Sequence, residues 1–335
     1  MKRVFKWLFI AAAGLAALGL VLASLAYWWL LYVEEVPEPG LAGVTVAGAL
    51  MHQGRERTWH AYIPPGDTDG MPLLLVMHGS QGDGGQMIEA TRYEFNRLAQ
   101  ADGFIPIYPN GFERHWNDCR AGANYSANTL NIDDVGFLGA LVAHMVETHG
   151  VDRSRVYATG ISNGGHMAYR LGLEAPELVA GIAAIVANMP APGNLGCRAG
   201  DTGLPTLIIN GTDDPVTPYD GGVIDLFGDT SRGRVLSSLD SALYWARLAG
   251  HEGDGVPRQW PDRAPDDGTR VESLSWSAPG KPSVMLVSVI GGGHTIPHPH
   301  YRMPRILGPT SHEFDAAGLI WNFLTTGDAV SGTAR

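Results

Sequence analysis

Two patterns of hydrophobic positions divide this sequence. The first is a long run near the N-terminus, because no charged residue occurs from position 7 to position 33. A membrane-spanning helix needs roughly 20 such residues, so the run predicts a transmembrane helix. In the second pattern, short continuous apolar runs alternate with longer segments whose apolar residues recur every three or four positions. This alternation predicts strands and helices that follow one another along the chain.

Charged residues on each side of the N-terminal run predict its orientation. Three basic residues precede the run and three acidic residues follow it: Lys2, Arg3 and Lys6, then Glu34, Glu35 and Glu38. Basic residues stay on the cytoplasmic side, so we expect a signal anchor that holds the rest of the chain outside the cytoplasm, in the periplasm or the extracellular space. The residues Ser24-Leu25-Ala26 also resemble a weak cleavage site, and secretion after signal cleavage is the alternative.

The second pattern predicts one domain built on a mostly parallel sheet with helices on both faces. Apolar runs predict an edge strand at 58–63 and further strands at 73–77, 104–108, 156–159, 179–187, 206–210 and 283–290. Helical spacing predicts helices at 86–100, 133–149, 162–173, 236–248 and 314–324. We expect Asn131 to cap the second of these helices and Gly150 to end it. The segment 250–280 is rich in Pro, Asp and Gly, which predicts a surface excursion.

Composition excludes some functions and suggests a disulfide. With 23 basic and 34 acidic residues, the net charge is −11, which argues against a nucleic-acid-binding protein. The apolar content of 45% excludes a disordered chain. We expect the two cysteines, Cys119 and Cys197, to pair, because disulfides form outside the cytoplasm. Such a bridge would close a long loop, which the chain-entropy model values at about 4.5 kcal/mol.

One short segment, Gly160-Ile161-Ser162-Asn163-Gly164, fits the pattern G-x-S-x-G. It lies directly after a predicted strand and directly before a predicted helix. This context predicts a nucleophile elbow, a sharp turn that exposes the hydroxyl of Ser162 above the sheet. An oxyanion formed there needs two backbone N–H donors, and we expect them from Asn163 and from Ser80 in the Gly-rich loop after strand 73–77. Because the backbone of Asn163 donates, we expect its side chain to matter little.

Two further strand ends carry the partners that a nucleophilic serine needs. A serine hydroxyl is activated when a histidine takes its proton and a carboxylate orients that histidine. His294 follows the predicted strand 283–290, and Asp213 and Asp214 follow the strand 206–210. We favour Asp214 over Asp213, because the residues from Asp214 to Pro218 fit the turn that usually follows the acid. The chain order Ser, Asp, His, with each residue just past a strand, is the order of the α/β-hydrolase fold.

Nothing in the sequence indicates a metal or another cofactor. His298 and His300 lie close to His294, but prolines interrupt the run and no acid or cysteine is spaced to complete a ligand set. We therefore expect serine-based chemistry that needs no metal ion and no other cofactor.

Several segments together resemble the esterase/polyhydroxybutyrate depolymerase family of α/β-hydrolases, which includes feruloyl and acetylxylan esterases. They are His78-Gly79-Ser80, Trp116-Asn117-Asp118, DDVGF at 133–137, YATGISNGG at 157–165, NGTDDP at 210–215 and GGGHT at 291–295. The resemblance covers about 58–326 and implies a serine esterase that cleaves polyesters, aryl esters or acyl-sugars. It also suggests that Trp116 lines the substrate cleft, with a packed aromatic as an equal alternative. Tyr219, just after the candidate acid, is a second candidate contact with substrate.

These inferences divide the chain into four parts. Residues 1–33 are a cytoplasmic stub and transmembrane signal anchor, 34–57 a linker and the edge of the domain, 58–326 an α/β-hydrolase catalytic domain, and 327–335 a C-terminal tail. The predicted function is hydrolysis of carboxylic esters through Ser162, Asp214 and His294. The expected partners are an ester substrate and the lipid bilayer, and no nucleic acid. The alternatives are a serine peptidase with the same three residues and a catalytically silent cell-envelope binding protein on the same fold.

Overall fold

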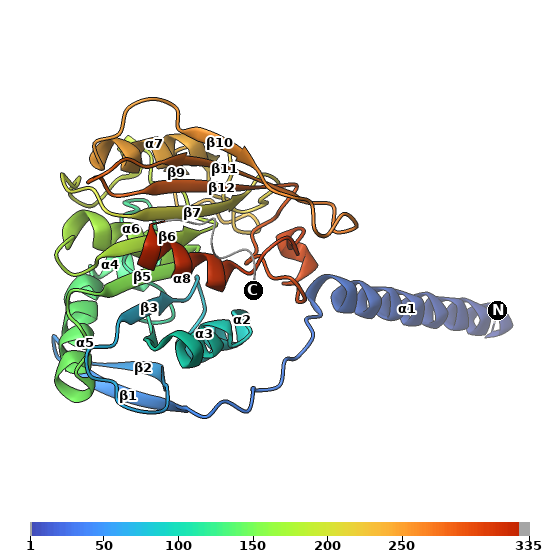
Figure 1. Ribbon diagram of the computed structural model, residues 1–335. Helices are drawn as coiled ribbons and strands as arrows, with labels where there is room; N and C mark the ends of the chain where they lie inside the picture. The colour runs from blue at the N-terminus through green and yellow to red at the C-terminus, as the bar shows by residue number, and fades with distance from the viewer. Residues whose placement is uncertain (1, 328–335) are drawn as a thin grey trace.

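The computed structural model describes residues 2–327, and the predicted C-terminal tail beyond residue 327 lies outside the described residues. Within this range ten strands form one sheet, in the order β1, β2, β4, β3, β5, β6, β7, β12, β11, β10 (Figure 1). They are β1 Val44–His52, β2 Arg55–Ile63, β3 Leu73–Met77, β4 Ile105–Pro109, β5 Val156–Ile161, β6 Gly181–Ile185, β7 Thr206–Gly211, β10 Val256–Gln259, β11 Arg270–Trp276 and β12 Val284–Ile290. Two short strands, β8 Gly222–Val223 and β9 Arg234–Val235, pair with each other.

The centre of the sheet is parallel and its edges are antiparallel. Strands β4, β3, β5, β6, β7 and β12 pair in parallel, each with its neighbour. Strands β2 and β11 run antiparallel to the central strands that they join, and β1 and β10 extend the two edges. Every residue of β3, β4, β5, β6 and β7 is buried. Burial on both faces explains their mostly apolar sequences, and the mostly parallel sheet is confirmed.

Helices cover both faces of the sheet (Figure 1). On one face lie α5 Asp134–His149, α6 Asn163–Glu174 and α7 Ser238–Leu248, whose Met167 and Trp245 join one buried apolar cluster. On the other face lie α2 Gly84–Ala90, α3 Glu94–Asp102 and α8 Ala316–Thr326, whose Met87 and Trp321 join a second cluster. The short helix α4 Ser126–Thr129 and the 3₁₀ turns η1 Pro192–Asn194 and η2 Arg305–Leu307 lie in connecting loops.

The single helix expected at 86–100 is wrong, because α2 and α3 share that segment. Arg92 and Tyr93 separate them in left-handed backbone conformations, with φ angles of 56° and 62°. The guanidinium of Arg92 donates to the carbonyl oxygen of Glu34, a long-range contact that local spacing does not reveal.

The expected cap of α5 is also wrong, since Asp133 rather than Asn131 accepts from the N–H group of the first turn.

The edges of the sheet differ most from the sequence-based expectation. The strand expected at the edge belongs to β2, and β1 pairs outside it. The segment expected as a surface excursion, 250–280, contains β10 and β11. In β11, Val271 and Ser273 are buried while Arg270 and Glu272 are exposed, an alternation typical of a half-buried strand. The surrounding Pro, Asp and Gly residues conceal this alternation in the sequence.

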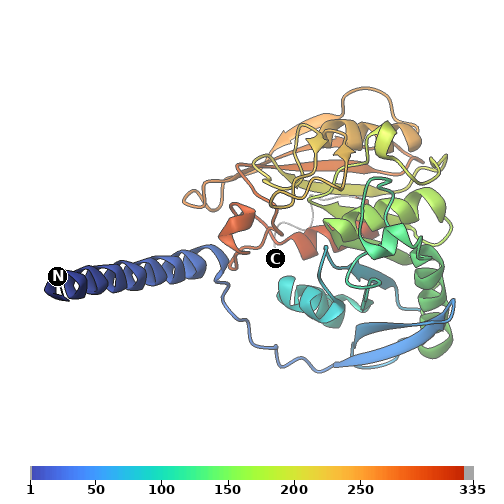
Figure 2. The ribbon, with the colours of Figure 1, turned by 180° about the vertical axis from the view of Figure 1, so that it is seen from behind.

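The N-terminal segment forms α1 Lys2–Leu31, a helix that projects away from the body (Figures 1 and 2). The stretch Arg3–Leu31 has a mean hydropathy of 2.4, and none of its most apolar window is buried inside the protein. By length and composition this helix can cross a membrane, and a signal sequence meets the same criteria.

In the body, Cys119 and Cys197 form the expected disulfide, with their Cα atoms 4.9 Å apart.

Candidate active site

The turn between β5 and α6 holds Ser162 in an unusual backbone conformation. Its φ and ψ angles are 54° and −115°, a strained combination for a residue with a side chain. Glycine is required on both sides of the turn. A Cβ atom on Gly160 would lie 2.4 Å from the carbonyl carbon of Gly164, and one on Gly164 would lie 2.3 Å from the carbonyl oxygen of Met77. The G-x-S-x-G segment therefore has the geometry of a nucleophile elbow.

Asp214 and His294 meet beside this turn. Asp214 follows β7 and His294 follows β12, and parallel pairing of these strands brings the two loops together. The Nδ1 atom of His294 lies 2.7 Å from Oδ2 of Asp214. The other carboxylate oxygen accepts from the backbone N–H groups of Val216 at 2.7 Å and Thr217 at 2.8 Å. These bonds fix the carboxylate, and the carboxylate in turn fixes the imidazole with Nε2 as the nitrogen that can take a proton.

The neighbouring Asp213 has different surroundings. Its side chain accepts from the hydroxyl of Thr212 at 3.1 Å, and the residue is exposed. By contrast, the side chain of Asp214 is 2% exposed and that of His294 is 7% exposed. Of the two candidate acids, Asp214 is therefore the one whose carboxylate contacts the ring of His294.

The loop after β3 approaches the elbow from the other side. A Cβ atom on Gly79 would lie 3.6 Å from the Cβ atom of Ser162, so this loop passes directly over the serine. His78 holds the loop in place: its Nδ1 lies 2.7 Å from the carbonyl oxygen of Gly79, and its Nε2 accepts from the N–H of Gly111 at 2.9 Å. Burial lowers the pKa of His78 to about 4. The ring is thus neutral at pH 7, and its two hydrogen bonds connect the loop at Gly79 to the backbone at Gly111.

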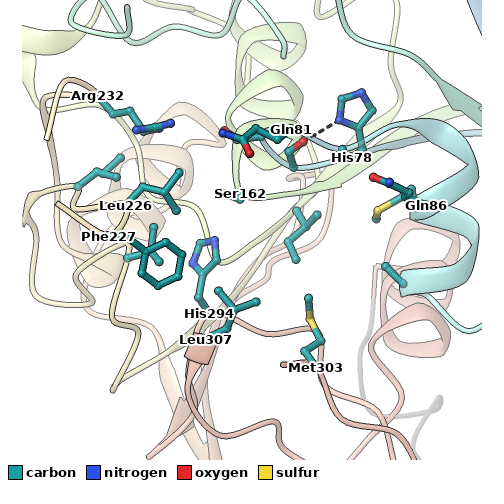
Figure 3. A pocket seen from close by; sticks show the side chains of 18 of the residues that line it. His78, Gln81, Gln86, Ser162, Leu226, Phe227, Arg232, His294, Met303 and Leu307 are labelled. Atoms are coloured by element: carbon teal, nitrogen blue, oxygen red, sulfur yellow. Dashed lines mark hydrogen bonds between the residues drawn. The ribbon is translucent and has the colours of Figure 1, made fainter. Parts of the chain in front are cut away.

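A cavity of about 510 Å³ opens in front of these residues. Figure 3 shows Ser162 and His294 facing it, with Phe227 and Leu226 on one side and Met303 and Leu307 below. Ser80, the second expected oxyanion donor, also lines the cavity. The apolar side chains suit an acyl or aryl group. Arg120 and Arg232 also contribute to the wall, and Figure 3 shows Arg232 on the side of Leu226.

The side chain of Asn163 has a structural role that the sequence does not reveal. It is completely buried. Its Oδ1 accepts from the N–H of Trp116 at 2.8 Å, and its Nδ2 donates to Asp118 at 2.6 Å and to the hydroxyl of Tyr125 at 3.1 Å. The side chain thus ties the first residue of α6 to the 116–125 loop, and the expected small effect of its removal on activity stays a prediction.

Asp118 is the centre of this buried network. Its carboxylate accepts from the guanidinium of Arg120 and, at 2.8 Å, from the hydroxyl of Tyr125. Burial alone would raise the pKa of Asp118, but the charge and hydrogen bonds of Arg120 hold the pKa at about 2. The carboxylate is therefore charged at any physiological pH. Cys119 lies between the two partners, so the disulfide to Cys197 secures the same loop.

The network also acts on His166 in the first turn of α6. The Nδ1 atom of His166 lies 2.9 Å from the carbonyl oxygen of Ser162. Burial, assisted by the positive charge of Arg120, lowers the pKa of His166 to about 3. A neutral imidazole is therefore bonded to the backbone of the elbow at Ser162. The sequence offered one signal for the network, the segment from Trp116 to Asp118, but gave these residues no role in positioning the elbow.

The two aromatic residues expected to contact substrate lie away from the cavity wall. Trp116 is completely buried, and its Nε1 donates to the carbonyl oxygen of His78 at 3.0 Å. Its ring supports the loop over the serine, which is the packed alternative. The hydroxyl of Tyr219 lies 2.5 Å from the hydroxyl of Ser288, a residue of β12. The cavity wall is built instead from residues of the segments 79–90 and 216–232, together with Met303 and Leu307.

The arrangement defines a class of protein. A mostly parallel sheet with a serine elbow after β5, an acid after β7 and a histidine after β12 is an α/β-hydrolase fold. The acetyl xylan esterase from Aspergillus awamori shares this fold with a TM-score of 0.52 at 16% identity, over 76% of this chain and 95% of that chain.

Sequence comparison identifies the family. Residues 58–189 match the family described as Esterase PHB depolymerase. The chain is 30% identical over 304 residues to NocK of Nocardia uniformis subsp. tsuyamanensis, which is named as an esterase, and the match covers 86% of this chain and 85% of NocK. Feruloyl esterase C of Emericella nidulans is 29% identical over 197 residues, which cover 57% of this chain and 67% of that protein. The chain belongs to the esterase/polyhydroxybutyrate depolymerase family.

Proposed function

We propose that this protein is a serine esterase in which Ser162 attacks the carbonyl carbon of a carboxylic ester. His294 takes the proton from the hydroxyl as the new C–O bond forms, and Asp214 holds the imidazole and stabilises its protonated form. His294 then gives the proton to the departing alcohol, which leaves an acyl group on Ser162. A water molecule, deprotonated by the same histidine, releases the acid and restores the serine.

The negative oxygen of each tetrahedral intermediate needs donors that are already in place. We assign this role to the backbone N–H groups of Asn163 and Ser80. Asn163 is the first residue of α6, where N–H groups lack partners within the helix. The positive end of the helix adds a favourable field. The buried side chain of Asn163 keeps this donor in position through its bonds to the 116–118 segment.

The cavity supports an ester with an apolar acyl or aryl part. Its wall combines apolar side chains, among them Leu226, Phe227 and Leu307, with the polar side chains of Arg120 and Arg232. Polyesters, aryl esters and acyl-sugars all contain such a group, and relatives carry the names of feruloyl and acetylxylan esterases.

The same proposal places the enzyme at a membrane, with α1 as a signal anchor and the body outside the cytoplasm. The length and hydropathy of α1 support an anchor, and the Cys119–Cys197 disulfide supports an oxidising compartment.

The observation that carries the proposal is the short His294–Asp214 bond beside a strained serine elbow in one cavity. A fluorophosphonate probe tests it, because such probes phosphonylate a serine that a neighbouring base activates. We expect stoichiometric labelling, mapped to Ser162 by mass spectrometry, and strongly slowed labelling of His294→Ala. The absence of labelling in the intact protein would favour a catalytically silent scaffold.

A further inference from the structure

The chain that leaves α1 touches one wall of the cavity. The guanidinium of Arg305 lies 3.8 Å from the centre of the Trp29 ring, and its Nη1 donates to the carbonyl oxygen of Trp29 at 3.2 Å. Trp29 is in the last turn of α1. Arg305 begins η2, which ends at Leu307, and Leu307 and Met303 line the cavity. The end of the anchor helix is therefore only one turn of chain away from residues that would contact substrate.

The segment that follows α1 also touches a second part of the cavity wall. Nη1 of Arg92 donates to the carbonyl oxygen of Glu34 at 2.9 Å, and Nη2 donates to the carbonyl oxygen of Arg302 at 3.3 Å. Arg92 lies two residues beyond the end of α2, whose Met87 and Ala90 line the cavity. Glu34 is the first charged residue after the apolar run. Glu34 lies three residues beyond the end of α1 at Leu31, and one residue spans at most about 3.6 Å. The bond from Arg92 to Glu34 therefore holds the part of the cavity wall near α2 close to the end of the anchor helix.

Apolar side chains are exposed on this side of the molecule. Ile306 of η2 is 37% exposed, and Phe227, at the cavity wall, is 62% exposed. Exposed side chains of this kind bury favourably in the boundary between lipid headgroups and acyl chains. The chain emerging from α1 runs past the loop that carries η2 in both views of the ribbon (Figures 1 and 2).

We infer that the face bearing the cavity rests on the membrane that holds α1, so that the enzyme draws amphiphilic esters with a long acyl chain from the lipid phase. This inference rests on the proposed function, both for the esterase chemistry and for the anchor. In this arrangement the acyl chain of a membrane-borne ester enters between η2 and α2. The hydrophobic part of the substrate then never crosses bulk water, which is where its transfer is costly.

The test uses the full chain reconstituted in phosphatidylcholine vesicles and compares two esters. One is p-nitrophenyl acetate, which reaches the site from water, and the other is 4-methylumbelliferyl oleate, which resides in the bilayer. The variant Ile306→Asp removes an apolar contact outside the cavity wall. We expect it to reduce oleate hydrolysis by about tenfold or more, while acetate hydrolysis changes by less than about twofold. The control is Leu130→Asp, which alters an exposed apolar residue after α4.

A second readout does not depend on turnover. A fluorophore attached at Ile306→Cys should be quenched by brominated lipid, and the same fluorophore at Leu130→Cys should not be. Quenching at position 306 together with selective loss of oleate hydrolysis supports the inference. Equal quenching at both positions, or unchanged oleate hydrolysis in Ile306→Asp, overturns it. A change at position 306 that depends on protein density and not on brominated lipid overturns it in favour of a second copy. If neither ester is hydrolysed, the proposed esterase function fails instead.

Discussion

Replacing Asp118 with asparagine should destabilise the protein strongly, although this residue lies outside the proposed catalytic group. The Asp118 side chain is 0% exposed and that of Arg120 is 2% exposed. Removing one partner of a buried ion pair typically costs about 3–5 kcal/mol, because the remaining charge is left without compensation. The depressed pKa indicates the same direction. A carboxyl group whose pKa moves from 3.8 to about 2 on folding contributes on the order of 2 kcal/mol at neutral pH.

The loss should also reach the active site. In Asp118→Asn, the Nδ2 group of Asn163 loses a charged acceptor that now lies 2.6 Å away. The backbone N–H of Asn163 is then held less firmly toward the oxyanion. Complete loss of one such donor lowers kcat by about 10²–10³, so a loosened donor should lower kcat by about tenfold. KM should change little, because the donor acts mainly in the transition state.

Urea unfolding at pH 7 measures the first effect, and steady-state hydrolysis of p-nitrophenyl butyrate measures the second. The matched control is Asp152→Asn, which breaks an exposed ion pair with Arg155 and should leave the unfolding midpoint unchanged. An Asp118→Asn protein with the midpoint of the wild type would refute the reasoning. The intact pair should also lose its contribution as the pH falls from about 4 to about 2, since a depressed carboxyl pKa stabilises the fold only above that window.

Three other predictions follow from the same geometry. Asp214→Asn should lower kcat by about 10⁴ through loss of the correct histidine tautomer, whereas Asp213→Asn should leave kcat nearly unchanged in the same ester assay. Reducing the Cys119–Cys197 bond, whose ends are 78 residues apart, should lower the free energy of unfolding by up to about 4.5 kcal/mol; equal urea midpoints with and without reductant would contradict this. Stability should fall as the pH drops from 6.5 to about 4, because burial lowers the pKa of His78 to about 4 and that of His166 to about 3, so the unfolded chain binds protons that the folded chain does not. A flat urea midpoint across that range would count against two neutral buried imidazoles.

The central strands and the elbow follow from local sequence. A strand buried on both faces is mostly apolar, so β3, with the sequence LLLVM, is recognisable without any knowledge of its partners, and β5 differs from this pattern mainly at Thr159. The elbow needs small residues at two fixed positions, and the close contacts around Gly160 and Gly164 show why. His294 and Asp214 could be proposed because each follows a strand in a known order along the chain.

Other features depend on contacts between distant segments and are invisible locally. The break between α2 and α3 coincides with bonds from Arg92 to Glu34 and Arg302. The buried role of Asn163 requires a loop more than 35 residues away, at 116–125. Trp116 carries an aromatic ring that suits either a cleft or a core, and only its bond to the carbonyl oxygen of His78 decides between them.

Turnover of p-nitrophenyl butyrate by the full-length protein, measured beside its Ser162→Ala variant in the same detergent, tests the central claim most directly. The proposed mechanism predicts steady hydrolysis by the intact protein and a fall in kcat of about 10³–10⁶ in the variant. The variant should unfold at the same urea concentration as the intact protein, which excludes misfolding as the cause. Equal turnover by the two proteins would contradict the account, because the nucleophile would then lie elsewhere.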